Sequence, residues 1–365
     1  MLLEWMTDAM KLGEAFLRQL ETTGGMPVAK QLSYLLRPAF IAEPGHTLVW
    51  GDFANIEARV LPWLAASPGA EGKLDIFRAV DADTTLPDVY MRTGAALDGR
   101  FTAEELWDAY KNDPDGELGK IASGIRQAQG KVPELSLGFG GGVGALVNMA
   151  INYGVYFDED TGREVVDKWR DENRWAVEFW GKHNRHESTG LIGAFNQAID
   201  DPGTIMSCGR VAFVFDPKYL GGSMLCALPC GRPITYASIR RGKFTVTDKD
   251  TGKKEEKHGI TYHKDYGRKA LWHGTIAENI TQGYAASVLR RTLVKLEYGE
   301  TCEWMPPVGH THDEAMVQCA EDHEVVTTAR KHLHDIMVEH EDYDADLPLA
   351  ADITSSWYYS KSVKN

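Results

Sequence analysis

Two acidic residues, far apart in the sequence, are the side chains best suited to chemistry. Asp52 comes near the end of the apolar run 46–53, which predicts a buried strand, and Asp313 lies in the segment His312-Asp313-Glu314. Magnesium is usually held by one or two carboxylates together with substrate phosphates. If the strands carrying Asp52 and Asp313 are neighbours, two Mg²⁺ ions bound between them could activate a hydroxyl group and stabilise a phosphate leaving group.

A cationic segment offers a second piece of the same chemistry. It reads Arg126-Gln127-Ala128-Gln129-Gly130-Lys131 and is followed by Phe139-Gly140. A helix turns about 100° per residue, so Lys131, Leu135 and Phe139 are expected on one face, with Lys131 available to a phosphate. Arg126 lies about 140° away from Lys131 on a regular helix. Either Arg126 reaches across, or the helix contains a local bulge; Pro133 is expected to kink it.

The segments Trp50–Arg59, Arg126–Gly140 and His312–Glu314 resemble, in this order, the three signature motifs of family A (DNA polymerase I-like) nucleotidyltransferases. Leu228-Pro229-Cys230-Gly231-Arg232 and Glu278-Asn279-Ile280-Thr281-Gln282 also resemble segments of phage-type members. The resemblance extends from about Leu32 to the C-terminus. It implies a DNA-directed DNA polymerase that adds dNTPs to the 3′-OH of a primer on a DNA template.

The resemblance also implies a role for each matching residue. Asp52, Asp313 and the backbone carbonyl of Phe53 would hold two Mg²⁺ ions, for which Mn²⁺ could substitute. Glu314 would be an accessory acid, and His312 would lie near the primer terminus. The implied substrate-binding residues are Lys131 and Arg126 for the triphosphate, Glu57 as the steric gate against a ribose 2′-OH, Arg59, Phe139 near the template base, Leu135 where many members have an aromatic residue, and Asn279 and Gln282 for the primer–template.

The order of expected elements predicts an α+β fold. An amphipathic helix is expected over 1–24, a strand over 46–53, a helix over 55–66, and mostly helix over 70–200. Short β-prone runs follow at 211–215, 225–228, 234–239, 244–247 and 260–263, then a long helix over 276–293, a hairpin over 308–319, a helix over 322–340 and an irregular tail.

On the resemblance, these elements form a right-hand polymerase. Residues 1–45 would be a helical lead-in, a remnant of the connection between thumb and palm. Residues 46–66 and 205–365 would form the palm, an antiparallel sheet with helices, and 67–204 the helical fingers. Because only 51 residues precede Asp52, we expect the thumb and the 3′–5′ exonuclease to lie on a second polypeptide.

Composition describes an ordinary globular protein of 365 residues, with 43% hydrophobic and 25% charged residues. No apolar run approaches the roughly 18 residues of a membrane span, and no signal peptide is visible, so we expect no membrane association. The expected location is the cytoplasm of a bacterium or a phage-infected host. Five cysteines at scattered spacings argue against a disulfide framework.

The formal net charge of −14 is unevenly distributed. Residues 240–269 contain ten Lys or Arg and five Asp or Glu, a balance of +5, whereas residues 321–346 contain two basic and nine acidic residues, a balance of −7. On charge alone, the basic segment is read as a solvated hairpin. A basic and an acidic segment can serve different partners if they lie on different faces.

Two other functions remain open from the residues alone. His310, His312 and Asp313 have a spacing that could serve a metal-dependent hydrolase, which would bind zinc or manganese. The shifted position of Arg126 also leaves open a non-catalytic DNA-binding accessory subunit that retains the polymerase fold.

Overall fold

The computed structural model describes residues 36–184, 186–247 and 254–360, so the helix expected over 1–24 lies outside the described residues. The described chain packs as two units. Unit 1 comprises the described parts of Met1–Ala54, Val288–Glu339 and Ala350–Asn365, and unit 2 comprises those of Asn55–Ser287 and His340–Leu349. The boundary falls within the long helix α13 (His273–Tyr298), which confirms the long helix expected in this part of the sequence.

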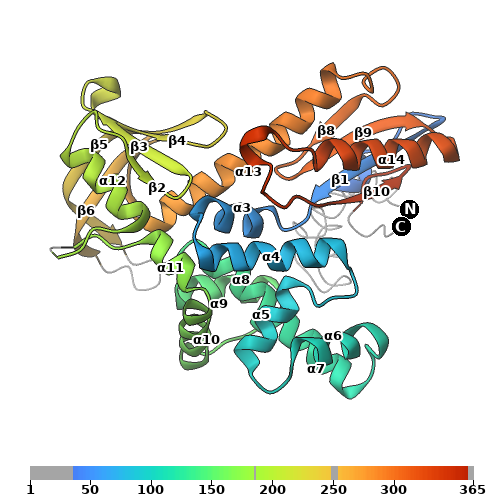
Figure 1. Ribbon diagram of the computed structural model, residues 1–365, viewed down its shortest axis with the longest axis horizontal. Coiled ribbons are helices and arrows are strands. Elements are labelled where there is room, and N and C mark those ends of the chain that lie inside the picture. Colours follow the sequence, from blue (N-terminus) through green and yellow to red (C-terminus); the bar gives the residue numbers. More distant parts are fainter. Residues whose placement is uncertain (1–35, 185, 248–253, 361–365) are drawn as a thin grey trace, which may run out of the picture. The chain divides into compact units, whose positions relative to one another are not determined.

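Unit 1 is built around an antiparallel sheet whose strand order is β10-β1-β9-β8. Its elements are η1 (Arg37–Ala39), β1 (His46–Phe53), β8 (Pro307–His310), β9 (Glu314–Ala320), α14 (His323–Met337) and β10 (Ala351–Ser356). Strand β1 has the predicted bounds and is central and almost wholly buried. Helix α14 runs across the sheet (Figure 1), where Met337 fills the space that a Cβ on Gly51 would occupy.

The end of the chain is ordered differently from the expectation. The prediction of an irregular tail after residue 340 is wrong for 351–356. These residues form β10, which pairs with β1 so that Ser356 is opposite Leu48 and Ala351 is opposite Phe53. This strand is short and only half-buried. Its hydrogen bonds come from β1, almost 300 positions earlier in the sequence, and local sequence patterns carry no signal of such a long-range pairing.

The first part of unit 2 is helical, as expected for 70–200. Its helices are α3 (Ile56–Ala65), α4 (Pro68–Ala82), α5 (Val89–Asp98), α6 (Ala103–Asn112), α7 (Glu117–Ile125), the π-helical turn η2 (Arg126–Lys131), α8 (Val132–Leu137), α9 (Val143–Asn152), α10 (Glu159–Glu172), α11 (Arg174–Trp180) and α12 (Gly190–Asp200). Side chains that cap helix N-termini start several of them at defined positions. Thr102 and Glu105 form a reciprocal capping box at α6, for example.

The second part of unit 2 is an antiparallel sheet in the order β2-β3-β4-β5-β6-β7. Its strands are β2 (Met206–Cys208), β3 (Val211–Asp216), β4 (Ser223–Ala227), β5 (Pro233–Thr247), β6 (Lys254–Lys264) and β7 (Gly267–Leu271); short turns η3 (Tyr219–Gly221) and η4 (Asp342–Asp344) complete the unit. The runs 234–239 and 244–247 are one strand, bent by an irregularity between Ala237 and Arg240. The α+β class is confirmed, although the described strands form two sheets where one was expected.

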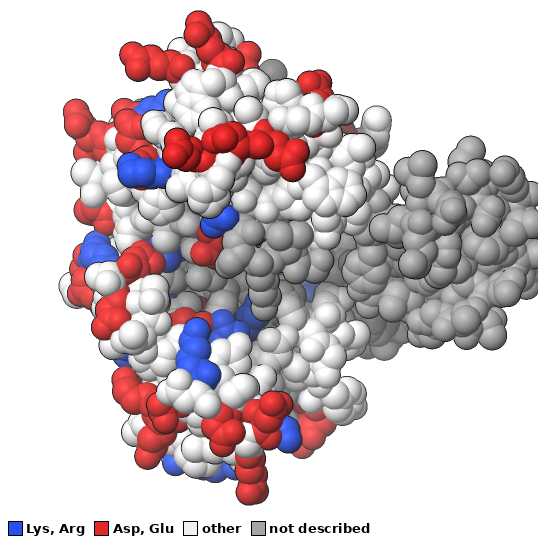
Figure 2. All heavy atoms as spheres, turned by 90° about the vertical axis from the view of Figure 1, so that its right-hand side faces the viewer, with Lys and Arg blue, Asp and Glu red and all other residues white. Residues whose placement is uncertain are grey.

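The surface follows the acidic composition. Figure 2 shows one face of the molecule with many Asp and Glu side chains and fewer Lys and Arg, as the 53 acidic and 39 basic residues of the chain would suggest. Among the described helices, none combines the length and the apolar character needed to cross a membrane.

Candidate active site

Of the two candidate metal-binding aspartates of unit 1, Asp52 lies on strand β1 and Asp313 in the turn that leads into the neighbouring strand β9. Strands β1 and β9 pair so that Asp52 is directly opposite Glu314. Asp313 lies in the turn before β9, and its carbonyl oxygen accepts a hydrogen bond from the backbone N–H of Phe53 at 3.0 Å. The sequence predicts a metal site only if these two segments are neighbours, and the structure shows that they are.

Glu314 is held inside the unit rather than presented to a ligand. It is 3% exposed and accepts hydrogen bonds from the Thr311 hydroxyl at 2.9 Å and from the Tyr359 hydroxyl. These bonds tie the β8–β9 turn to the segment after β10. His312 is exposed, and its Nδ1 lies 2.7 Å from the Asp313 carboxylate. Glu314 can therefore fix the turn, and His312 can orient the carboxylate of Asp313.

The oxygen atoms of this region fit a magnesium site. Asp52 is half-buried, the Asp313 side chain is 21% exposed, and Mg²⁺ prefers hard oxygen ligands of this kind. Among the described residues, no three His, Cys, Asp or Glu side chains are grouped to hold a metal ion. A magnesium ion, which keeps waters and phosphate oxygens as ligands, does not need such a group. The three-ligand site of His310, His312 and Asp313 that a hydrolase would require does not form.

A third carboxylate was missed in the sequence. Asp352 of β10 is directly opposite Asp52, and residues directly opposite each other in an antiparallel pair project from the same face of the sheet. It is exposed. The β-branched pair Ile353-Thr354 beside it was the available signal for a strand, but it is too short to identify one on its own.

The cationic segment contains a bulge, one of the two alternatives left open by the sequence. Arg126–Lys131 is a π-helical turn, and such a turn accommodates one more residue than an α-helical turn. Arg126 and Lys131 are thus one turn apart despite their five-residue spacing. Gly130 allows the bulge to pack, because a Cβ there would lie 2.0 Å from the Tyr90 carbonyl oxygen.

Both cations of this turn are in contact with other side chains. The Arg126 Nε donates to Asp88 at 2.9 Å, and its guanidinium lies over the rings of Tyr90 and Tyr110. The Lys131 Nζ is 5.0 Å from the centre of the Tyr153 ring. Burial lowers the pKa of Lys131 from its ordinary value, and the nearby charge of Arg126 lowers it further.

A cavity of about 240 Å³ in unit 2 collects several of the predicted substrate-binding residues. Glu57, Leu135, Phe139 and Gln282 line it. Gln282 donates to the Glu57 carboxylate at 3.1 Å. We call this space the α3–α8 cavity. Tyr153, which carries Lys131 over its ring, is also part of its wall.

Helix α8 ends earlier than expected. Its last residue is Leu137, so Phe139 lies beyond the helix on which the sequence predicted it. The cause is the glycine-rich segment that follows, in which Gly140 adopts a φ of +77° that other residues rarely accept. Pro133 directly follows the π-helical turn, so its missing backbone N–H falls inside the continuous helical run 117–137 rather than at a free N-terminus.

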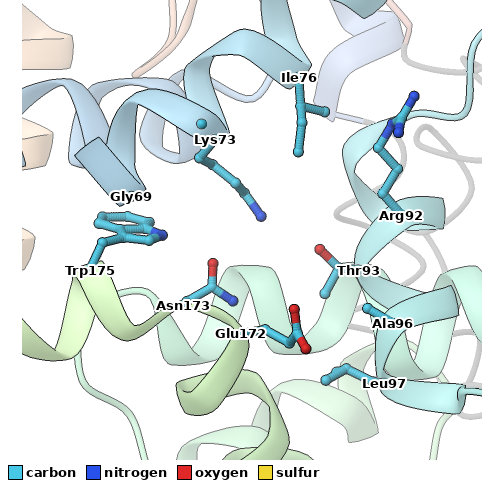
Figure 3. A pocket seen from close by; sticks show the side chains of 11 residues that line it. Gly69, Lys73, Ile76, Arg92, Thr93, Ala96, Leu97, Glu172, Asn173 and Trp175 are labelled. Carbon is cyan, nitrogen blue, oxygen red and sulfur yellow. The ribbon is translucent and has the colours of Figure 1, made fainter. Parts of the chain in front are cut away.

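A buried ion pair fixes α8 to its surroundings. The Lys73 Nζ lies 2.6 Å from Glu134, and the two side chains are 10% and 5% exposed. The Thr93 hydroxyl donates to the same carboxylate oxygen at 2.6 Å. Figure 3 shows Lys73 of α4 and Thr93 of α5 lining a second cavity of about 310 Å³. Lys73 and Glu134 also line the α3–α8 cavity, so this pair connects α4 and α5 to the cavity wall.

Two predicted substrate-binding residues are engaged elsewhere in unit 2. Arg59 is 3% exposed, forms an ion pair with Asp81 and lies over the Phe77 ring. Asn279 donates to the hydroxyl of Tyr236 at 3.2 Å. The structure does not bring either residue into the lining of the α3–α8 cavity.

Comparison with known proteins gives two curated relatives. The chain is 29% identical over 331 residues to a DNA polymerase of Bacillus phage SP02, a match that covers 90% of this chain and 44% of that protein. It is 26% identical over 165 residues to DNA polymerase I A, chloroplastic/mitochondrial, of Arabidopsis thaliana, covering 44% of this chain and 15% of that protein. The chain thus spans less than half the length of each relative. No protein-family model matches it.

Among solved structures, the chain is similar to the POL domain of Pol1 from M. smegmatis in complex with DNA primer-template and dNTP. The TM-score is 0.49 at 12% sequence identity, over 89% of this chain and 42% of that one.

Proposed function

We propose that this chain, a relative of DNA polymerases of the DNA polymerase I type, adds dNTPs to the 3′-OH of a primer under the direction of a DNA template. The observation that carries the proposal is the placement of Asp52 on β1 and of Asp313 in the turn before the neighbouring strand β9, joined by the hydrogen bond from the Phe53 N–H to the Asp313 carbonyl at 3.0 Å. The names of both curated relatives support it.

The carboxylates of Asp52 and Asp313, with the carbonyl of Phe53, would hold Mg²⁺, with Mn²⁺ as a substitute. When bound, a pair of such ions supplies Lewis-acid activation of the primer hydroxyl and stabilises the pyrophosphate that leaves. His312 keeps the Asp313 carboxylate oriented through its 2.7 Å contact. Glu314 acts on the same carboxylate indirectly, because its buried bonds fix the turn that carries Asp313.

Residues of unit 2 would bind the incoming nucleotide. Lys131 and Arg126, one π-helical turn apart, would neutralise phosphate oxygens. Glu57, held in place by Gln282, would exclude a ribose 2′-OH by occupying its space. Leu135 and Phe139 would contact the sugar and the template base from the apolar side of the α3–α8 cavity.

The remaining predicted residues receive supporting roles. Arg59 holds α3, which carries Glu57, against α4 through its pair with Asp81. Asn279 and Gln282 lie three residues apart on α13 and would contact the primer–template from one side of that helix. The division into a palm (46–66 and 205–365) and fingers (67–204), preceded by a lead-in (1–45), is part of the same proposal.

A second polypeptide that carries the thumb, the 3′–5′ exonuclease or both is also part of the proposal. Its support is that the chain corresponds to only 44% of the phage relative. The phage relative also supports a location in the cytoplasm of an infected host. Affinity purification of the chain from its source cell tests the partner: recovery of a protein that increases the length of extension products supports it, and full-length extension by the purified chain alone contradicts it.

Primer extension tests the function itself. The chain is incubated with Mg²⁺, four dNTPs and a labelled primer, either annealed to a template or alone. Extension that follows the template sequence is expected. Retained binding to the primer–template without any extension would instead favour a non-catalytic accessory subunit.

A further inference from the structure

A large cavity in unit 2 is lined by none of the residues assigned above to nucleotide addition. It has a volume of about 770 Å³ and lies among the segment 181–184, helix α12 and strands β5, β6 and β7. This is within the range of cavities that bind small ligands. It includes part of the basic segment 240–269, for which the proposed function gives no role.

The charge of this cavity differs from that of the chain. Lys182, His183, Arg241 and His258 line it, and no Asp or Glu is among its described lining residues, although acidic residues outnumber basic ones 53 to 39 in the whole chain. Arg241 is held in place by Asp200 and by Asn196, whose side-chain oxygen lies 2.9 Å away. The lining therefore offers the cations Lys182 and Arg241 to an anionic ligand.

One wall of the cavity is aromatic. Trp272 is 46% exposed and meets the ring of His273 edge-on, with ring centres 4.9 Å apart. His273 in turn stacks on Trp180 at 5.9 Å with an interplanar angle of 18°. The Trp180 indole is fixed by its hydrogen bond to the Gly138 carbonyl at 3.0 Å. An exposed indole on a rigid base of this kind is a surface on which a planar ring can stack.

His273 contributes to the wall as a neutral ring. Its pKa is lowered by burial and, to a smaller degree, by the nearby Arg170. Its ring also closes the space beside Gly140, where a Cβ would lie 2.8 Å from its Nε2. The wall is therefore stacked and uncharged at His273, while the positive charge of the lining is on Lys182 and Arg241.

We propose that this cavity binds a nucleotide, with its base stacked on Trp272 and its phosphate beside Lys182 and Arg241. The nucleotide is either one unit of an unpaired strand or a free nucleoside triphosphate, since both offer an aromatic ring and an anion. Sites of this composition bind single strands by stacking and by attraction of the backbone, with little dependence on sequence. The inference does not depend on polymerase activity.

Binding of a fluorescent oligonucleotide of about 12 dT residues, measured by anisotropy without metal, provides the first test. Trp272→Ala should weaken binding about 5- to 100-fold, the range found when a stacking aromatic is removed. Tyr266→Ala is the matched control, because Tyr266 is fully exposed at the β6–β7 turn outside the cavity. Lys182→Glu should weaken binding several-fold more than Lys264→Glu, which makes the same charge change on β6.

Photocrosslinking locates the contact directly. An oligonucleotide with 5-iodouracil should crosslink at Trp272, identified by fragmentation of the tryptic peptide 270–290, because that peptide also contains Asn279 and Gln282. Loss of this crosslink on addition of unlabelled dATP assigns the cavity to free nucleotides, and its persistence assigns it to a strand. Trp272→Phe serves as the second variant in case Trp272→Ala fails to fold. Because it keeps an aromatic ring, it should retain most of the oligonucleotide binding.

The proposal is overturned if no crosslink appears at Trp272 and both cavity variants bind like their controls. Because these assays contain no metal and require no extension, a failure here is distinguishable from a failure of the proposed polymerase activity.

Discussion

Arg126 and Lys131 stand at the two ends of one π-helical turn, and Arg126 is held there by the carboxylate of Asp88. Asp88 also caps α5 by accepting a hydrogen bond from the Met91 amide at 2.8 Å. If Arg126 binds the triphosphate as proposed, this carboxylate competes with the triphosphate for its guanidinium, and Asp88 then sets how readily Arg126 binds a nucleotide.

Replacement of Asp88 by asparagine should release Arg126 while it preserves the cap, since asparagine caps helices as well as aspartate does. We expect the KM for dNTPs to fall about two- to fivefold, the range of a partly exposed ion pair. Asp75→Asn, which removes a surface partner of Arg78, is the control. An unchanged KM together with a lower melting temperature would show that the pair is only structural.

The lowered pKa of Lys131 predicts an alkaline limit to nucleotide binding. As pH rises through this lowered pKa, Lys131 loses its charge, so the KM for dNTPs should begin to increase at a lower pH than an ordinary lysine would allow. Lys131→Arg keeps its charge over the whole accessible range and should move the increase to higher pH. Steady-state kinetics between about pH 7 and about pH 10 measures this. Coincident profiles for the two proteins would argue against a phosphate contact by Lys131.

Two glycines on either side of the α7–η2 junction should respond oppositely to alanine. Gly130→Ala places a Cβ 2.0 Å from the Tyr90 carbonyl and should destabilise the protein by about 1–3 kcal/mol. At Gly124 nothing lies within 4 Å, and a helical Gly→Ala change there should stabilise by about 0.5–1 kcal/mol. Denaturant unfolding measures both. Equal midpoints for the two variants would contradict the tight packing of the π-helical turn against α5.

The Lys73–Glu134 pair should show strong coupling. Lys73→Met leaves the Glu134 carboxylate buried without its cation and should cost about 3–5 kcal/mol of stability. The double variant Lys73→Met/Glu134→Leu should recover much of this loss, because neither charge remains buried. A double-mutant cycle of unfolding free energies tests the coupling. Simple additivity of the two single changes would contradict it.

Those parts of the fold that depend on local patterns were predictable. The apolar run 46–53 gave a strand with the observed bounds, and the helical spacing of 276–293 gave the core of α13. Strand β10 was not predictable, because its pairing with β1 joins segments almost 300 positions apart in the sequence. The continuous β5 was split in the prediction, since the polar, glycine-containing segment 240–243 between its two β-prone runs resembles a turn when its partners are unknown.

The local structure around the candidate site was predictable in part. Residue type and order made Asp52, Asp313 and Lys131 candidates, and the five-residue spacing to Arg126 indicated either a bulge, which is the alternative observed, or a reach across the helix. The spacing could not identify Asp88 as the partner of Arg126, or Asp352 as the neighbour of Asp52, because both contacts depend on tertiary structure. The early end of α8 was also missed, since it depends on how Gly140 is used.

The most direct test of the account is Mg²⁺-dependent primer extension by the chain and by its Asp313→Ala variant, with Asp335→Ala on the exposed surface of α14 as the control. We predict template-directed extension by the chain and by the control, and a loss of about a thousandfold or more in the Asp313 variant, whose unfolding midpoint should stay close to that of the chain. Extension by the Asp313→Ala variant at the rate of the unchanged chain would contradict the assignment of the carboxylate pair, and with it the proposed function.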